Sequence, residues 1–290
     1  LLLAATGEVV AEKSGVLNLG VEGLMLIGAI TGYMTAYNTG NKWVALLVVI
    51  IVCGLMGLVL SFLMVSLRTN QVATGIAFTI FCTGLSALLG KPYIGVVIKD
   101  AFKKLPVSFL DNAPRIQLIF KQDILVYMAI ILTVCAWFVV YKTKIGLHIR
   151  AAGENPHTLD SLGVNVYAVR YGATIFGSIL AGLGGAYLSL AYSPSWIEGM
   201  AAGRGWLTIA LVNFALWNPK NAVAGAYLFG IFYALSYRIE AIGIAVPSYF
   251  LRMMPYFLPL VILILVSLKA KGKTSYVPKA LATPYIREGK

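Results

Sequence analysis

The amino-acid sequence predicts an all-α protein that crosses a membrane several times. Its composition is 59% hydrophobic and 12% charged, whereas an average soluble chain is about 45–50% apolar and about 25% charged. The mean hydropathy is +0.84. The apolar residues gather in runs of roughly 20 residues, the length of a helix that crosses the hydrocarbon core. A chain of 290 residues has room for about eight to ten crossings and for no additional soluble domain.

The predicted spans follow one another with short connections. They lie near 22–38, 43–67, 71–90, 124–141, 168–191, 205–217, 221–238 and 254–268, after a partial apolar segment at the start. The chain begins LLLAATGEVV without an initiator methionine or a basic leader. We therefore expect the upstream part of the first segment to be missing, and no signal peptide. The expected organisation is one transmembrane domain, 1–268, followed by a basic tail, 269–290.

A polar stretch at 145–170 interrupts the apolar pattern most sharply. Asn155 can accept hydrogen bonds from the free N–H groups of a helix start, and Pro156 suits the first helical position. Gly163 can adopt the left-handed conformation that ends a helix. The sequence therefore predicts a short capped helix within a loop at 142–167, and we expect this helix to dock a soluble partner.

Basic residues around this stretch predict its side of the membrane. Lys142, Lys144 and Arg150 follow one span and Arg170 opens the next, and basic residues near span ends collect on the cytoplasmic side. The tail, 269–290, carries six Lys or Arg residues and one Glu. We therefore expect both the polar stretch and the C-terminus to be cytoplasmic.

The alternation of spans then fixes the other loops. It places 192–204 outside, the WNPKN turn inside, 239–253 outside and 91–123 outside. Basic residues outnumber acidic ones in the last of these loops, which opposes the assignment, but the better-placed neighbouring spans require it. Pro92, Pro106 and Pro114 disfavour a further helix there, so we expect an irregular cap.

Polar residues and glycines also break the apolar pattern between 7 and 32. These residues are Glu8, Glu12, Lys13, Gly15, Asn18, Gly20, Glu22 and Gly23. A discontinuous helix at membrane depth must satisfy its free backbone groups with protein or water, and it usually lines a pathway. Asn18 and Glu22 are the expected pore-facing groups, since intramembrane polar side chains seldom face lipid. The alternative is an ordinary cytoplasmic turn at 12–20.

Two further places carry polar groups inside apolar sequence. Asn70, Gln71 and Thr74 open one span and can hydrogen-bond either a polar solute or neighbouring helices. Trp196 and Glu198 lie in a Gly-rich bend at 192–219. This bend predicts either an interfacial aromatic belt with a local ion pair to Arg204, or a re-entrant stretch near the outer mouth of a pathway.

Small residues recur at the spacing that lets membrane helices approach closely. The pairs are Gly28 with Gly32, Ser178 with Gly182, and Ala181 with Gly185. Because lipid offers no hydrophobic drive between helices, such pairs favour tight packing. They predict a compact bundle, with dimerisation as a further use.

The sequence predicts no catalytic residues, metal site or cofactor. GKT at 272–274 resembles the end of a phosphate loop, but Ser267 occupies the position of the required first glycine. His148 and His157 have no matching cluster of cysteines or carboxylates. The net charge of +12 fits anionic lipid and topology better than nucleic acid. Any nucleotide energy must come from another chain.

Several motifs together resemble one family. They are SGVLNLGVEGLMLIGA, TGLSALLGKPYIG, GLHIRAAGENPHTLDSLGVNVYAVRY, AGLGGAYLSLAYSPSWIEGMAAGRGW and WNPKNAVAGAYLFG. In this order the motifs look like the permease subunits of bacterial ATP-binding cassette (ABC) importers for simple sugars, branched-chain amino acids and nucleosides. The resemblance runs from residue 7 to about 268 and is strongest to the nucleoside and simple-sugar subgroup.

The resemblance implies an all-helical, type II-like importer permease bundle. It also implies two permease subunits as a homodimer or heterodimer, separate ATPase subunits, and an extracytoplasmic solute-binding protein or lipoprotein. The polar loop would be the coupling helix that enters a groove of the ATPase. The residues that match it are Gly153, Glu154, Asn155, Pro156, Asp160 and Gly163.

The function expected from this resemblance is transport rather than enzymatic catalysis. The chain would form the pathway for nucleosides, purine nucleosides among them, in the bacterial inner membrane, with a simple sugar such as a pentose as the alternative solute. Two rivals remain from the residues alone. One is a secondary transporter that uses the intramembrane acids for ion coupling, and the other is a purely structural subunit.

Overall fold

The computed structural model describes residues 1–98, 100–103, 122–242, 250, 253, 257, 261, 264 and 276–287. The described α-helices are α1 (Leu2–Lys13), α2 (Val21–Thr39), α3 (Lys42–Ser61), α4 (Gln71–Gly90), α6 (Ile124–Lys142), α7 (Lys144–Glu154), α8 (Pro156–Ser161), α9 (Val166–Tyr187), α10 (Arg204–Phe214) and α11 (Pro219–Ala241). Short helical turns extend α3 to Ser66, α4 to Tyr93 and α9 to Tyr192. These residues contain no strand, only isolated bridges between 94–97 and 195–196.

Five of the described helices are long and apolar enough to cross a membrane. They cover Lys42–Ser66, Gln71–Tyr93, Ile124–Lys142, Val166–Tyr192 and Pro219–Glu240. Each coincides with a span that the sequence predicts, which confirms the all-α, multi-pass fold class. Most of the predicted span at 254–268 lies outside the described residues, as do residues 104–121 of the predicted cap at 91–123.

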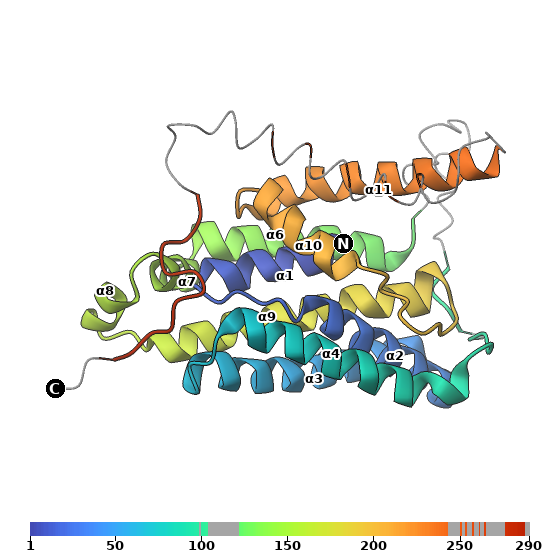
Figure 1. The fold of residues 1–290 in the computed structure, drawn as a ribbon, viewed down its shortest axis with the longest axis horizontal. Coiled ribbons are helices and arrows are strands. Elements are labelled where there is room, and N and C mark those ends of the chain that lie inside the picture. The colour runs from blue at the N-terminus through green and yellow to red at the C-terminus, as the bar shows by residue number, and fades with distance from the viewer. Residues whose placement is uncertain are drawn as a thin grey trace.

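The helices run roughly along one axis, and α9 lies among α1, α2 and α3 (Figure 1). Backbones meet at glycines: a Cβ on Gly28 of α2 would lie 2.1 Å from the carbonyl oxygen of Gly182 on α9. A Cβ on Gly185 would likewise lie 1.8 Å from the carbonyl oxygen of Met25. These contacts confirm the predicted close packing at the small residues of α2 and α9.

An irregular segment, 14–20, separates α1 from α2. α1 ends at Lys13, residues 14–20 run back along it, and α2 begins at Val21 near the middle of the bundle (Figure 1). Ser14, Gly15, Val16, Asn18 and Gly20 of this segment are buried. The break therefore places irregular backbone inside the bundle.

The predicted span at 205–217 is wrong as a complete crossing. The helix there, α10, has 11 residues and measures about 16 Å, too short for the hydrocarbon core. Its first turn lies against Glu22 at the start of α2. The chain therefore descends from one end of the bundle to its middle before α10 starts.

The two ends of the bundle carry different segments. α7, α8 and the last described segment, 276–287, lie at one end, and residues 91–98 lie at the other beside 193–203 (Figure 1). Ile98 donates its N–H to the carbonyl of Pro194, and Phe102 donates to that of Leu190. This separation agrees with the alternation of sides expected from the sequence.

Candidate functional site

Buried side chains hold the irregular backbone of the break. Glu8 Oε1 accepts a hydrogen bond from the N–H of Asn18 at 3.0 Å, and Gln71 Oε1 accepts one from Leu17 at 2.8 Å. Asn18 Oδ1 in turn accepts the N–H of Gly20 at 2.9 Å. Backbone groups inside a membrane protein must be satisfied internally, and here three side chains perform that task.

Helix α4 forms the wall behind the break. Gln71 and Thr79 are eight positions apart and so lie on one face of α4. The hydroxyl of Thr79 donates to the carbonyl oxygen of Leu19 at 3.0 Å. A Cβ on Gly75, between them, would meet the Cβ of Leu19 at 2.8 Å, so the break packs directly on the α4 backbone. Sequence reasoning singled out Gln71 but missed Thr79. The spacing of eight residues from Gln71 could have indicated that Thr79 faces the same segment.

Glu22 joins the start of α2 to the start of α10. Its Oε1 accepts the N–H of Gly203 at 2.8 Å, and its Oε2 accepts that of Gly205 at 2.6 Å. These are free N–H groups at the start of α10, where a carboxylate also interacts favourably with the helix dipole. A Cβ on Gly205 would lie 2.5 Å from Cα of Glu22, so only glycine permits this approach.

A second carboxylate links α1 to the turn between α10 and α11. Glu12 Oε2 accepts a hydrogen bond from the indole N–H of Trp217. Leu216 and Trp217 both have positive φ, 51° and 54°, a conformation that L-residues seldom adopt. The contact thus fixes a tight turn against the end of α1, close to the break.

The other residues proposed for a pathway are placed differently. Asn70 is exposed and caps its own helix by accepting from Ala73, and Thr74 donates to Thr69 one turn away. Trp196 is 1% exposed and packs against Gly90, while Glu198 is exposed. The structure therefore brings Asn18, Glu22 and Gln71 together around the break and leaves these four apart from it.

The ion pair expected between Glu198 and Arg204 does not form. The Arg204 guanidinium instead donates to the carbonyl of Met200 and to the hydroxyl of Tyr233, and it lies 4.9 Å from the centre of the Tyr233 ring. Cation–π contact and neutral acceptors suit an arginine at the bundle surface. This arginine therefore joins the bend at 193–203 to α11.

The polar stretch forms the capped helix that the sequence predicts, α8. A second helix, α7, precedes it and was not predicted. Asn155 Oδ1 accepts the N–H of Thr158 at 3.1 Å, and Pro156 is the first residue of α8. Gly163 has φ +80°. Sequence reasoning missed α7, which follows α6 after one intervening residue, Thr143, and ends at Glu154. Its signal was the sequence GLHIRAAGE, which alternates apolar and polar residues at helical spacing.

α8 presents one face to the bundle and another outward. Pro156 and Leu159 are buried, whereas His157, Thr158 and Ser161 are exposed. Leu162, which follows α8, is 75% exposed. An apolar side chain held out at the tip of a short rigid helix suits insertion into a groove of another protein.

Arg170 is a site residue whose role sequence reasoning missed, since it was considered only as a marker of topology. It lies in the first turns of α9 and is 1% exposed. Its guanidinium donates to the carbonyl oxygens of Thr283 at 3.0 Å and Ala152 at 3.4 Å. The available signal was its position at the start of an apolar span, where a charge needs polar partners.

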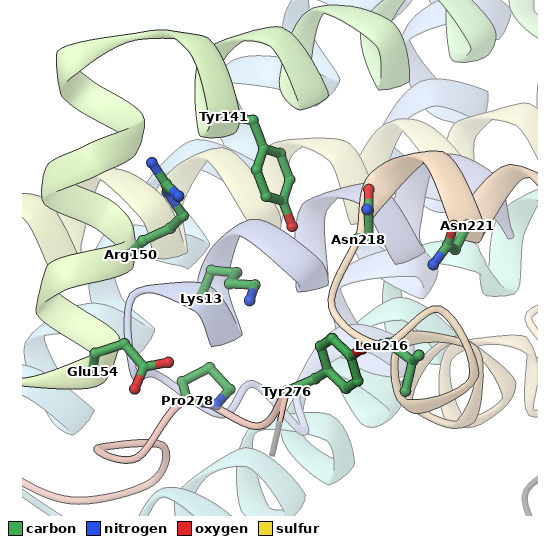
Figure 2. A pocket seen from close by; sticks show the side chains of 9 residues that line it. All are labelled: Lys13, Tyr141, Arg150, Glu154, Leu216, Asn218, Asn221, Tyr276 and Pro278. Atoms are coloured by element: carbon green, nitrogen blue, oxygen red, sulfur yellow. The ribbon is translucent and has the colours of Figure 1, made fainter. Parts of the chain in front are cut away.

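A polar cavity of about 560 Å³ opens between these elements. Its walls come from the end of α1, from α6 and α7, from the turn before α11, and from the last described segment. Figure 2 shows Lys13 extending between Tyr141 and Tyr276, with Glu154 and Pro278 to one side. The last turns of α7 and the end of α1 thus share one polar cavity.

Comparison with known proteins places the chain in a family. The model of a family described as "Branched-chain amino acid transport system / permease component" matches residues 1–267. A putative glucose ABC transporter permease, TsgC13 of Haloferax volcanii, is 41% identical over 251 residues, which cover 84% of this chain and 76% of that protein. No solved structure matches the chain.

Two relatives named for nucleosides match over almost the full length. The nucleoside ABC transporter permease NupC of Lactococcus lactis and the guanosine ABC transporter permease NupQ of Bacillus subtilis are each 31% identical over 301 residues. Each match covers 99% of this chain and 93% of the relative. The chain therefore belongs to the permease family of ABC transport systems, and it is a multi-pass membrane transport subunit rather than an enzyme.

Proposed function

We propose that this permease forms the pathway for a nucleoside in an ABC importer. The observation that carries the proposal is the match over 99% of the chain to two permeases named for nucleosides and guanosine. A purine nucleoside is the first solute to test, because one of these relatives is named for guanosine.

A simple sugar is the second candidate solute. The relative named for glucose has the higher identity, 41%, although the match covers less of the chain. A nucleoside contains a ribose ring, so both solutes offer hydroxyl groups that carboxylate and amide side chains can bind.

The pathway would be controlled at the break and at the start of α10. Asn18, Glu22 and Gln71 hold two irregular segments in the bundle interior. Their hydrogen bonds fix one arrangement of α1, α2, α4 and α10, and a second arrangement would require these bonds to be exchanged. Such discontinuous helices allow segments to rock around a site near the membrane centre. Asn70, Thr74, Trp196 and Glu198 lie outside this centre.

Energy would enter through α8. In this proposal the outward face of α8 docks into an ATPase subunit, and closure of two ATPases moves α7 and α8 as one unit. Gly153, Glu154, Asn155, Pro156, Asp160 and Gly163 would shape this unit. The cap at Asn155 keeps α8 rigid, so a displacement at its tip reaches the base of α7.

The proposed assembly places this chain in the bacterial inner membrane with its C-terminus in the cytoplasm. Residues 1–268 would be the permease domain, with the coupling loop at 142–167, and 269–290 the basic tail. Its partners would be a second permease subunit, alike or homologous, two ATPase subunits, and an extracytoplasmic solute-binding protein or lipoprotein.

The test is uptake by the complete complex in lipid vesicles. The complex is reconstituted with its ATPase, second permease and binding protein, and labelled guanosine, adenosine, ribose and glucose are supplied outside with ATP inside. We expect nucleoside uptake that stops when ATP is withheld and is unchanged by proton or sodium ionophores. Uptake of sugars alone would select the second candidate, and uptake driven by an ion gradient without ATP would refute the proposed function.

A further inference from the structure

We propose that the C-terminal strap, residues 276–287, is the mechanical link between α8 and the break at 14–20. The proposal rests on the proposed function, because such a link matters only in a permease driven through α8. The family model matches residues 1–267, so the strap lies outside the segment that this model covers. Figure 1 shows the strap in red, crossing beside α7 and passing α8.

The strap contacts the last turn of α7. Ala280 donates its N–H to the carbonyl oxygen of Gly153 at 2.8 Å, one of the carbonyls that a helix C-terminus leaves without an internal partner. A Cβ on Gly153 would lie 2.3 Å from the carbonyl oxygen of Lys13 and 3.2 Å from Cβ of Pro278. The end of α1 and the strap therefore both press against this turn.

The strap is also anchored beside α8. Tyr285 is 4% exposed, and its ring centre lies 5.2 Å from that of His157 and 5.5 Å from that of Tyr167. Arg287 Nε lies 3.1 Å from Asp160 Oδ2. An exposed ion pair contributes little, so the buried Tyr285 ring is the main anchor.

The same strap reaches the break. Ala282 donates its N–H to the carbonyl oxygen of Gly15 at 3.2 Å, and Gly15 has φ +92°. Arg170 donates to the carbonyl of Thr283. Within residues 280–283 the strap is thus bonded to α7, to the break and to α9.

Only a short stretch of the strap joins its bond to α7 with its bond to the break. Three residues span at most about 10 Å. A displacement of the last turn of α7 must therefore either break one of the two hydrogen bonds, that of Ala280 to Gly153 or that of Ala282 to Gly15, or move Gly15. The far side of the break is bonded to Glu8 and Gln71. Motion of α8 would therefore pass through the strap to α1 and α4.

The first test changes one residue of the strap in the complete reconstituted complex. Ala282 has φ +60°. Ala282→Pro removes the N–H and demands a negative φ, whereas Ala282→Gly keeps the N–H and suits a positive φ. We expect Ala282→Pro to lower the solute moved per ATP hydrolysed by about fivefold or more, with the ATPase still co-purifying. Ala282→Gly should keep the wild-type ratio.

A second pair tests the other anchor independently. Tyr285→Ala removes the buried ring and should lower the same ratio, while Tyr285→Phe keeps the ring and should restore it. Unchanged ratios in both Ala282→Pro and Tyr285→Ala would overturn the proposal, and so would loss of the ATPase from both complexes, which would make the strap part of the docking surface. A wild-type complex without ATP-driven uptake would instead refute the proposed function.

Discussion

At the scale of single residues, buried polar side chains hold backbone that no helix satisfies. Glu8 and Gln71 accept N–H groups of the break, and Glu22 accepts those at the start of α10. Each bond replaces one that water cannot supply inside the bundle. A polar residue here is thus a structural requirement, whether or not it also contacts solute.

Glu22 gives the sharpest prediction at this scale. Glu22→Gln leaves one acceptor for the two N–H groups and brings an amide N–H toward them, so we expect a loss of about 2 kcal/mol, since hydrogen bonds to charged groups contribute about 1.5–3 kcal/mol each. Thermal unfolding in detergent should show a lower Tm, and uptake should fall with it. Glu198→Gln, at an exposed position, is the matched control, and an equal effect of the two changes would contradict this role.

Asn155 tests the rigidity of α8. Asn155→Ala removes the side-chain acceptor for the N–H of Thr158, and loss of such a cap costs about 1 kcal/mol. We expect solute-stimulated ATP hydrolysis and uptake to become uncoupled while the permease remains folded. Asn155→Asp keeps the cap and should behave like the wild type. Normal coupling in Asn155→Ala would argue against a rigid α8.

At the scale of elements, the short helix α10 starts in the middle of the bundle, against the start of α2. α10 is too short to cross the membrane, and Glu22 ties its start to the start of α2. Thr79 on α4 bonds the carbonyl of Leu19 in the break, and Trp217 bonds the side chain of Glu12 in the last turn of α1. This arrangement concentrates irregular backbone where segments can rearrange without unfolding a full span.

Packing between α2 and α9 can be tested with two glycines. Gly28→Ala places a Cβ 2.1 Å from the carbonyl oxygen of Gly182, and overpacking of this kind costs about 1–3 kcal/mol. Gly84→Ala, on α4, meets nothing within 4 Å and should be neutral or stabilising because alanine favours helices. Thermal unfolding of the two variants compares them directly. A Gly28→Ala protein as stable as Gly84→Ala would show that α2 and α9 are not closely packed.

The elements differ in how far the sequence predicts them. Long apolar runs, the Asn155 cap and the break at 14–20 follow from local composition, and the structure has them. Partners distant in sequence do not follow: Leu17 and Gln71 are 54 positions apart, and Glu22 and Gly203 are 181 apart. For the same reason, 205–217 was wrong as a span, because its apolar composition does not show that the start of α10 is bound by Glu22 in the middle of the bundle.

At the scale of the whole molecule, α8 and the strap lie at one end and residues 193–203 at the other (Figure 1). Cysteine labelling can assign these ends to the two sides of the membrane. With Cys53, Cys82 and Cys135 replaced by Ala, Ser161→Cys should react with an impermeant maleimide only after the membrane is opened. Glu198→Cys should react in intact cells. The reverse pattern would contradict the proposed cytoplasmic position of α8 and the C-terminus.

The central claim is that energy from a separate ATPase enters this permease through α8. It is tested most directly at Leu162, the exposed apolar residue after α8, by measuring solute uptake and ATP hydrolysis in the same vesicles. Leu162→Glu would place a charge in an apolar groove, so we predict loss of ATPase binding and of uptake, while Leu162→Met retains both. Uptake and solute-stimulated hydrolysis at wild-type rates in Leu162→Glu would contradict the claim.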